Sequence, residues 1–242
     1  MHTLEKRSTT ARIVEVFSSI QGEGPHVGRR HIFVRFFACN LRCLYCDTPE
    51  SLTGNPPARL EMDPGSGEFQ TLQNPLDLDT VAQAITRLAA FPHDAVSLTG
   101  GEPLLQSEFL LNLLPRIREL GLSTYLETNG TLPENLAKVL HLVDTVSMDI
   151  KLPQTLGNAR DWFAAHRDFL AVAKQTEVFV KLVVPAAPDW DYIRQAAEMV
   201  AAVDGSIPFI LQPLTPCGSL TIAPDTAEIT RAYALGRQFL GD

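Results

Sequence analysis

The sequence predicts an α/β protein with a mostly parallel sheet and helices packed outside it. Apolar runs bounded by turn residues alternate with stretches of helical periodicity about five times along the chain, and such an alternation produces parallel neighbouring strands. The run 178–184 reads Val-Phe-Val-Lys-Leu-Val-Val, which fits a strand buried on both faces. At 242 residues a single domain is expected, because α/β barrels often use this many residues for one core.

Each expected strand is an apolar run between turn signals. In chain order, the expected strands are Ile13 to Ile20, Ile32 to Phe37, Ala95 to Thr99, Ser123 to Glu127, Thr145 to Ile150, Val178 to Val184 and Pro208 to Pro213. Amphipathic periodicity predicts helices over 79–91, 105–120, 134–141, 159–174, 189–203 and 224–240. Residues 53–75 are rich in Pro, Gly and polar residues, so they are expected to be a surface insertion within the domain 1–242.

Composition and charge exclude several classes of protein. The chain has 20 Lys and Arg against 28 Asp and Glu, which gives a net charge of −8. This charge argues against a broad basic surface that binds nucleic acid. No stretch approaches the roughly 20 apolar residues of a membrane helix, and the N-terminus lacks the apolar core of a signal peptide. Three of the four cysteines crowd into 39–46, which is typical of a metal site in a reducing compartment. The cytoplasm is therefore the expected location.

Several of the expected strands end in polar or glycine-rich residues. These ends are 99–103 (Thr-Gly-Gly-Glu-Pro), 127–131 (Glu-Thr-Asn-Gly-Thr), 149–151 (Asp-Ile-Lys) and 212–213 (Gln-Pro). Ligands bind at the carboxyl ends of strands in parallel α/β sheets, so we expect the four ends to face one pocket. For any single end, Gly and Asn could serve only to turn the chain.

Cys39, Cys43 and Cys46 have the spacing C-x3-C-x2-C directly after an expected strand. A closed zinc site needs four protein ligands, and no second pair or nearby histidine pattern is visible. A four-iron cluster held by three thiolates keeps one iron without a protein ligand, where a cofactor can bind and receive an electron. Two alternatives stay open at this point: a zinc site completed by Cys217, and three buried cysteines without metal.

The cysteine spacing resembles the cluster-binding loop of the radical S-adenosylmethionine (SAM) superfamily. The segment 99–103 is similar to the superfamily's GGEP strand end. Further segments resemble the 7-carboxy-7-deazaguanine synthase family, and together the matches run from about residue 13 to about 213. They are 19–24 (Ser-Ile-Gln-Gly-Glu-Gly), 33–41 (Phe-Val-Arg-Phe-Phe-Ala-Cys-Asn-Leu), 46–48 (Cys-Asp-Thr), 126–131 (Leu-Glu-Thr-Asn-Gly-Thr) and 211–213 (Leu-Gln-Pro).

The resemblance implies a fold, a reaction and a set of cofactors. The fold is a modified, incomplete TIM-like (β/α) barrel of the radical SAM type, usually as a homodimer. The reaction converts 6-carboxy-5,6,7,8-tetrahydropterin to 7-carboxy-7-deazaguanine with loss of ammonia, on the route to queuosine and other deazapurines. It uses SAM, a [4Fe-4S] cluster, Mg²⁺ and an electron donor such as flavodoxin. No direct nucleic-acid or membrane partner is implied.

The resemblance also assigns metal and cofactor residues. Cys39, Cys43 and Cys46 would ligate three irons, and Thr48 is the magnesium position, although alone it would be an N-cap candidate. The residues that contact SAM would be Tyr45, Cys46 and Asp47 in the cluster loop, Gly101 and Glu102 at the GGEP strand end, and Asp149, Lys151 and Gln212 at later strand ends. Of these, Glu102 is suited to bind the SAM ammonium group and Asp149 is a proposed ribose ligand. Gln212 is a weaker candidate. Gly101 and Glu102 could also be plain turn chemistry.

The expected substrate residues come from two strand regions. Ile20, Gln21, Gly22 and Glu23 match the loop that binds the amide edge of the pterin, for which Gln21 and Glu23 offer donors and acceptors. Arg35 is the candidate for a bidentate clamp on the substrate carboxylate, with a buried ion pair to an acid such as Glu15 as the alternative. Thr99 would add a hydrogen bond.

The chain departs from the family pattern at three places. Asp149-Ile150-Lys151 stands where Ser-Pro-Lys is more common, and Ala38 where glycine is usual. The family's final Pro-Gln-x-His-Lys pattern, whose end contacts substrate, is absent before Asp242, so we expect either a truncated chain or a pocket closed differently. Residues 53–75 could form a lid or a dimer contact.

Other functions compete with the deazaguanine synthase. A glycyl-radical activating enzyme, which acts on a protein, shares the cysteine spacing but lacks the sequence motif at 21–24 and an arginine equivalent to Arg35. The further alternatives are an iron–sulfur carrier without catalysis and a structural zinc protein.

Overall fold

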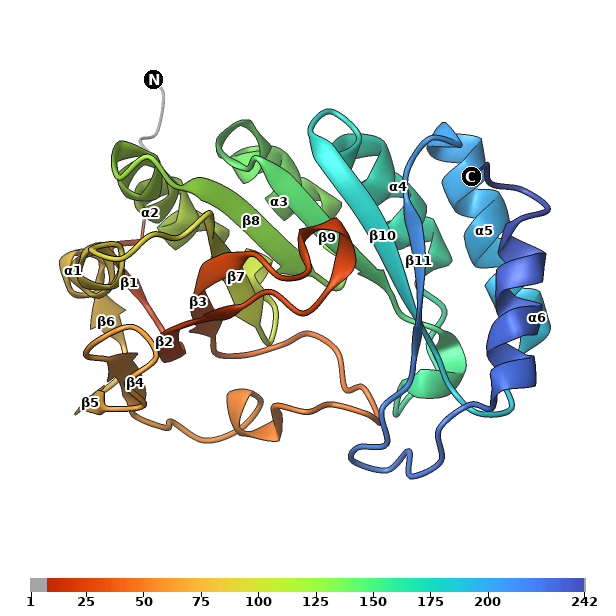
Figure 1. Cartoon of the computed structure of the whole chain (residues 1–242), viewed down its shortest axis with the longest axis horizontal. Helices are drawn as coiled ribbons and strands as arrows, with labels where there is room; N and C mark the ends of the chain where they lie inside the picture. The colour runs from red at the N-terminus through yellow and green to blue at the C-terminus, as the bar shows by residue number, and fades with distance from the viewer. Residues whose placement is uncertain (1–7, 242) are drawn as a thin grey trace, which may run out of the picture.

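The computed structural model describes residues 8–241 and places most strands in one strongly curved sheet (Figure 1). The sheet has nine strands in the order β11-β10-β9-β8-β7-β3-β2-β4-β5, and a second sheet pairs β1 with β6. Within the described residues, β11 and β5 each have one neighbour in the large sheet, so the sheet does not close on itself. This arrangement confirms the expected incomplete barrel.

The parallel part of the sheet follows the predicted strands closely. Six strands run parallel: β3 (Arg30–Phe36), β7 (Ala95–Gly100), β8 (Ser123–Thr128), β9 (Thr145–Ile150), β10 (Glu177–Val184) and β11 (Phe209–Pro213). All six residues of β9 are buried, as expected for a strand covered on both faces. The first long strand, β2 (Ile13–Ile20), instead pairs antiparallel with β3, because the loop 21–29 that connects them is shorter than a parallel crossover needs.

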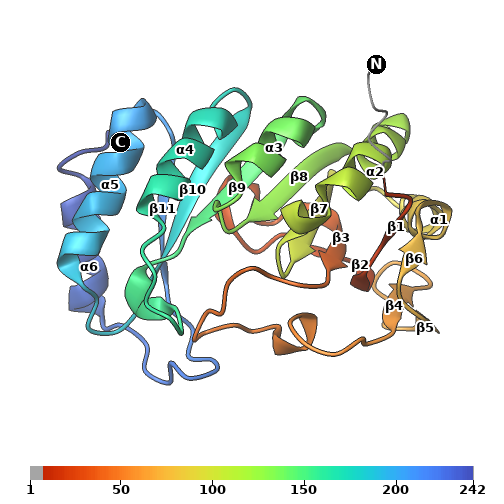
Figure 2. The same cartoon turned by 180° about the vertical axis from the view of Figure 1, so that it is seen from behind.

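The helices cover the outer face of the sheet (Figure 2). They are α1 (Leu78–Leu88), α2 (Ser107–Glu119), α3 (Pro133–Val139), α4 (Phe163–Ala173), α5 (Trp190–Asp204) and α6 (Thr226–Gly236). Asp77, Asp189 and Asp225 cap α1, α5 and α6 by accepting backbone N–H bonds, and Asp225 forms a capping box with Glu228. No helix of the described residues is both long and apolar enough to cross a membrane.

The predicted insertion, residues 53–75, contains structure that the sequence analysis missed. It forms the hairpin β4 (Ala58–Glu61) and β5 (Phe69–Leu72), which extends the large sheet beyond β2. Another missed pair is β1 (Thr10–Ala11) with β6 (Leu76–Asp77). The buried carboxylate of Glu61 accepts bonds from the backbone N–H groups of Ser18 and Gly65, at 2.7 and 3.0 Å, and so ties the hairpin to β2.

The carboxyl end of β7 meets the start of the cysteine loop at very short range. Ala38, just before Cys39, has a φ of 76°, a conformation that explains why glycine is usual there in the resembling family. The Ala38 carbonyl accepts a bond of 2.8 Å from the backbone N–H of Glu102, and a Cβ on Gly101 would collide with that carbonyl. Gly101 is therefore required for packing of the chain against itself, besides any approach to a cofactor.

Replacing Gly101 by Ala should destabilise the protein by about 1–3 kcal/mol, because the added methyl forces the cysteine loop away from β7. Urea unfolding of the metal-free protein, followed by circular dichroism, measures the loss. Gly205→Ala is the matched control, since nothing lies within 4 Å of a Cβ there, and it should change stability by no more than about 0.5 kcal/mol. Equal stabilities of the two variants would contradict the packing role.

Candidate active site

One cavity of about 700 Å³ opens at the carboxyl ends of β7 to β11. The four strand ends that the sequence analysis singled out all contribute to it, which confirms that they face one pocket. Of the sequence-predicted site residues, all but Glu102 line the cavity: Ile20, Gln21, Gly22, Glu23, Arg35, Cys39, Cys43, Tyr45, Cys46, Asp47, Thr48, Thr99, Gly101, Asp149, Lys151 and Gln212. None of the described residues 53–75 lines it, so the structure gives no support to a lid.

The three cysteines of the loop 39–46 are half-buried free thiols that face this cavity. The loop is anchored by hydrogen bonds from the N–H of Leu44 to the carbonyl of Thr155 and from the N–H of Gly157 to the carbonyl of Arg42, both 2.9 Å. Burial raises the pKa of Cys39 to about 11, so its thiol is protonated until a metal displaces the proton.

This donor set fits a cluster better than a single zinc ion. Among the described residues, no three His, Cys, Asp or Glu side chains converge closely enough to hold one metal ion. An iron–sulfur cluster is larger than one ion and is held by more widely spaced thiolates. Cys217 lines the same cavity, but its Sγ contacts the carbonyl oxygen of Cys46 at 3.6 Å, not a common centre with the three thiols.

A loop from the far end of the chain rests on the cysteine loop. The N–H of Ser219 donates to the carbonyl of Leu44 at 2.7 Å, and Gly218 packs so closely against that carbonyl that a side chain would clash. Residues 214–217, which precede this contact, form part of the cavity wall together with Gln212.

Glu102 turns away from the cavity. Its side chain is fully buried and accepts hydrogen bonds from the N–H of Leu104 (3.1 Å), the hydroxyl of Thr128 (2.9 Å) and the N–H of Asn129 (2.8 Å). Burial raises its pKa to about 7, against the effect of these three donors. The expectation that this carboxylate holds the SAM ammonium therefore does not match its position; it fixes the ends of β7 and β8.

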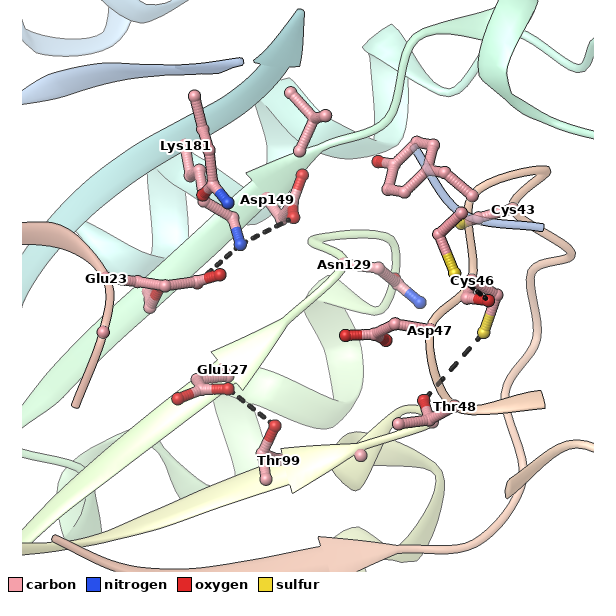
Figure 3. A pocket seen from close by; sticks show the side chains of 18 of the residues that line it. Glu23, Cys43, Cys46, Asp47, Thr48, Thr99, Glu127, Asn129, Asp149 and Lys181 are labelled. Carbon is pink, nitrogen blue, oxygen red and sulfur yellow. Dashed lines mark hydrogen bonds and ion pairs between the residues drawn. The ribbon is translucent and has the colours of Figure 1, made fainter. Parts of the chain in front are cut away.

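Thr48 occupies the N-cap position of a short 3₁₀ helix, Pro49–Ser51, yet its side chain makes no capping bond. Its hydroxyl faces the cavity and lies 3.9 Å from Sγ of Cys46 (Figure 3). The simple capping explanation for this residue is thus wrong, and a hydroxyl is left available to a ligand.

Gln21 is less free than the sequence analysis expected. It is 2% exposed, its Nε2 donates to Oε1 of Glu127 at 2.9 Å, and its Oε1 accepts from the N–H of Glu23 at 3.0 Å. Glu127 also accepts a bond of 2.6 Å from the hydroxyl of Thr99 (Figure 3), and burial raises its pKa. Gln21 therefore orders the surrounding donors and acceptors as well as lining the cavity.

Arg35 forms the ion pair that the sequence analysis gave as one alternative, and it also lines the cavity. Its Nε donates to Oε1 of Glu15 at 2.9 Å, so the ion pair exists, and its side chain is 20% exposed at the cavity wall. No hydrogen bond from the described residues engages its two terminal nitrogens. Glu15 orients the guanidinium, and the two remaining nitrogens are left to clamp a planar anion.

Asp149 lies between two lysines at the end of β9. Its Oδ2 is 2.8 Å from Nζ of Lys151 and 3.2 Å from Nζ of Lys181. Although burial would raise it, the pKa of Asp149 is lowered by the two lysines, so the group is a carboxylate. Its Oδ1 is buried without a hydrogen-bond partner among the described residues, which leaves one acceptor for a ligand hydroxyl.

Lys181 lines the cavity but was not among the predicted site residues, and Glu127 and Asn129, in a strand end that was expected to face the pocket, were given no role of their own. Asn129 donates to Oδ1 of Asn40 at 2.9 Å and contacts Sγ of Cys39 at 3.8 Å. Lys181 carried a usable signal, because it is the charged residue inside the apolar run 178–184.

Comparisons with known proteins agree with the site. The Radical SAM superfamily matches residues 33–173. A 7-carboxy-7-deazaguanine synthase of Geobacter sulfurreducens is 45% identical over 234 residues, covering 95% of this chain and 90% of the relative. One from Methanocaldococcus jannaschii is 34% identical, covering 86% and 85%. The crystal structure of QueE from Escherichia coli has a TM-score of 0.61 at 20% identity, covering 96% and 93%, and so supports the fold.

Cys43→Ala should abolish the brown colour, the bound iron and sulfide, and all SAM cleavage, because it removes one of three cluster thiolates. Iron and sulfide analysis after anaerobic reconstitution, with visible absorption, measures the loss. Cys217→Ala is the matched control and should keep the cluster. A zinc content that disappears in Cys217→Ala would instead establish the zinc alternative.

His166→Gln should flatten the acid dependence of stability. His166 is buried, accepts from the N–H of Lys151 (3.2 Å) and lies 3.0 Å from the carbonyl of Gly130; burial lowers its pKa to about 4. Between about pH 4 and 6.5 the unfolded chain binds a proton at this histidine that the native chain does not bind. The contribution of His166 to the free energy of unfolding is therefore fully present above about pH 6.5 and falls by about 3 kcal/mol as the pH drops to about 4.

Urea unfolding at several pH values between 4 and 7 tests this contribution. The difference between wild type and His166→Gln should shrink steadily as pH falls. His141→Gln, on the exposed surface, should keep the wild-type slope. A slope unchanged by His166→Gln would show that other groups cause the acid sensitivity.

Proposed function

Since the chain belongs to the radical SAM superfamily and, within it, to the 7-carboxy-7-deazaguanine synthases, we propose that it converts 6-carboxy-5,6,7,8-tetrahydropterin to 7-carboxy-7-deazaguanine with release of ammonia. One observation carries the proposal: a single cavity brings the cysteine triplet together with the 20–23 loop and Arg35. The product belongs to the route to queuosine and related deazapurines.

The cysteine loop would hold a [4Fe-4S] cluster through Cys39, Cys43 and Cys46. When bound, the cluster and SAM supply reductive radical chemistry that belongs to the cofactors. The protein's own task is to hold SAM and the pterin in one place and to exclude water. The enclosed thiols and the ordered strand ends support this division of work.

Residues on the cluster side of the cavity are proposed to hold SAM. Tyr45 and Asp47 flank the last cluster cysteine, and Gly101, directly after β7, lines the same cavity. The unpaired Oδ1 of Asp149 supports the role of a ribose ligand, since a sugar hydroxyl can donate to it. Lys151 and Gln212 complete this side.

Residues on the other side are proposed to bind the pterin. Ile20, Gly22 and Glu23 belong to the loop that would contact the pterin, and the hydrogen bonds of Gln21 fix the shape of this loop. Arg35 would bind the substrate carboxylate, and Thr99 would orient Glu127 and reach the substrate from β7. The hydrogen bonds that already fix these groups mean that little reorganisation is needed on binding.

Thr48 is proposed to bind Mg²⁺. A hard cation that keeps most of its waters needs only one or two protein oxygens when the substrate supplies others. The uncapped hydroxyl of Thr48, facing the cavity beside Cys46, supports this role.

Three further properties are proposed from the family resemblance: a flavodoxin-type electron donor, a homodimer and a cytoplasmic location. The four free cysteines support a reducing compartment.

An anaerobic assay of reconstituted protein with SAM, dithionite, Mg²⁺ and the pterin tests the function, with 7-carboxy-7-deazaguanine detected by mass. Product should appear with little net loss of SAM. Cleavage of SAM to 5′-deoxyadenosine without product would overturn the proposed substrate, and no cleavage at all would overturn the radical chemistry.

Arg35→Lys in this assay should lower pterin turnover at least about tenfold while uncoupled SAM cleavage persists, because an ammonium cannot form two parallel hydrogen bonds to a carboxylate. Arg59→Lys is the matched control, since Arg59 approaches the same Glu15 (3.9 Å) from the exposed surface. Equal loss of turnover and SAM cleavage in Arg35→Lys would instead assign Arg35 a structural role.

A further inference from the structure

Lys181 is a charged residue in the middle of the apolar strand β10, and neither the sequence motifs nor the proposed chemistry gives it a role. Its side chain is 12% exposed and lines the cavity. Its Nζ lies 2.5 Å from Oε2 of Glu23 and 3.2 Å from Oδ2 of Asp149 (Figure 3). Although burial alone would lower it, the pKa of Lys181 is raised by these two carboxylates. A cation is thus held between the loop proposed for the pterin and the carboxylate proposed for SAM.

The contacts continue from Asp149 to the cysteine loop. Lys151 lies 2.8 Å from Oδ2 of Asp149, and its Nζ is also 3.1 Å from the hydroxyl of Tyr45, which lies between Cys43 and Cys46. We refer to Glu23, Lys181, Asp149, Lys151 and Tyr45 as the polar chain. It runs without a gap from one side of the cavity to the other.

Both carboxylates of the polar chain depend on Lys181. Glu23 belongs to the proposed pterin loop, and Lys181 is the cation that contacts it among the described residues. Asp149 shares one oxygen between Lys151 and Lys181 and leaves the other unpaired. Inside a protein, charge pairs of this kind interact strongly, so a shift of Lys181 toward one carboxylate weakens its hold on the other.

We propose that Lys181 is a positioning residue that couples the two halves of the cavity, so that binding of the pterin at the Glu23 side orders Asp149 for SAM, and binding of SAM orders Glu23 for the pterin. This inference rests on the proposed function. It assigns Lys181 no contact with the reacting atoms. Its effect is a coupling free energy between two binding sites, which must be reciprocal.

The test is an equilibrium measurement on cluster-loaded protein without reductant, so that SAM is bound but not cleaved. The dissociation constant of SAM is measured by anaerobic equilibrium dialysis with and without saturating pterin. In the wild type the pterin should tighten SAM binding by about fivefold or more, and SAM should tighten pterin binding by the same factor. Lys181→Met, which keeps the length of the side chain and removes its charge, should bring both factors close to one.

Two further variants separate coupling from simple damage. Glu23→Gln breaks the same ion pair from its other end, and the double variant with Lys181→Met should lose no more coupling than either single variant. Lys181→Arg keeps the positive charge and should retain part of the factor by which each ligand tightens binding of the other. Lys174→Met, an exposed lysine on the outer surface, is the matched control and should behave as the wild type.

The outcomes distinguish failure of the inference from failure of the proposed function. A Lys181→Met protein that binds both ligands more weakly, with the factors unchanged, would show that Lys181 is merely structural and overturn the coupling. A wild type in which neither ligand changes the dissociation constant of the other would overturn the coupling as well. A wild type that binds SAM but not the pterin would overturn the proposed substrate, and the coupling with it.

Discussion

The backbone and the buried carboxylate of Glu102 together connect the three segments on which the cavity depends. Its backbone N–H binds the carbonyl of Ala38 at the start of the cysteine loop, and its side chain binds the N–H of Asn129 at the end of β8. The cysteine loop and two strand ends are therefore fixed to one residue inside the core. A buried acid is costly unless its hydrogen bonds are made, and here three donors make them. Movement of this group would break these bonds, so they hold the ends of β7 and β8 in place.

Much of the fold could be predicted from hydrophobic periodicity. Strand β10 is nearly continuous in apolar residues because both of its faces are covered, and each of the strands β7 to β11 is followed by a helix before the next strand or the end of the described chain. The hairpin β4–β5 escaped prediction because its strands are four residues each and β4 carries the charges of Arg59 and Glu61. Its stability comes from contacts distant in sequence, above all the bonds of Glu61 to β2, and local patterns do not contain that information.

The sequence predicted which residues lie at the site better than it predicted the directions in which their side chains point. Motifs at the ends of strands come together because parallel strands share one edge, so topology predicted that the end 149–151 would face the pocket, whereas Arg35 was assigned from the family resemblance. The inward turn of Glu102 and the internal bonds of Gln21 could not be inferred, since both residues are equally suited to bind a ligand. Lys181 belongs to no motif, and its importance appears only once Glu23 and Asp149 are seen on either side of it.

The contact between the 214–219 loop and the cysteine loop has a consequence for biosynthesis. Leu44 and Ser219 are far apart in the chain, so the wall around the three thiols is complete only after nearly the whole polypeptide has been made. Domains fold largely as units while synthesis proceeds from the N-terminus. Until β11 and the loop after it have left the ribosome, Cys39, Cys43 and Cys46 stand at an open edge, reachable by iron donors and by oxidants alike. A cluster inserted before that point would therefore lack the part of its wall that the 214–219 loop supplies.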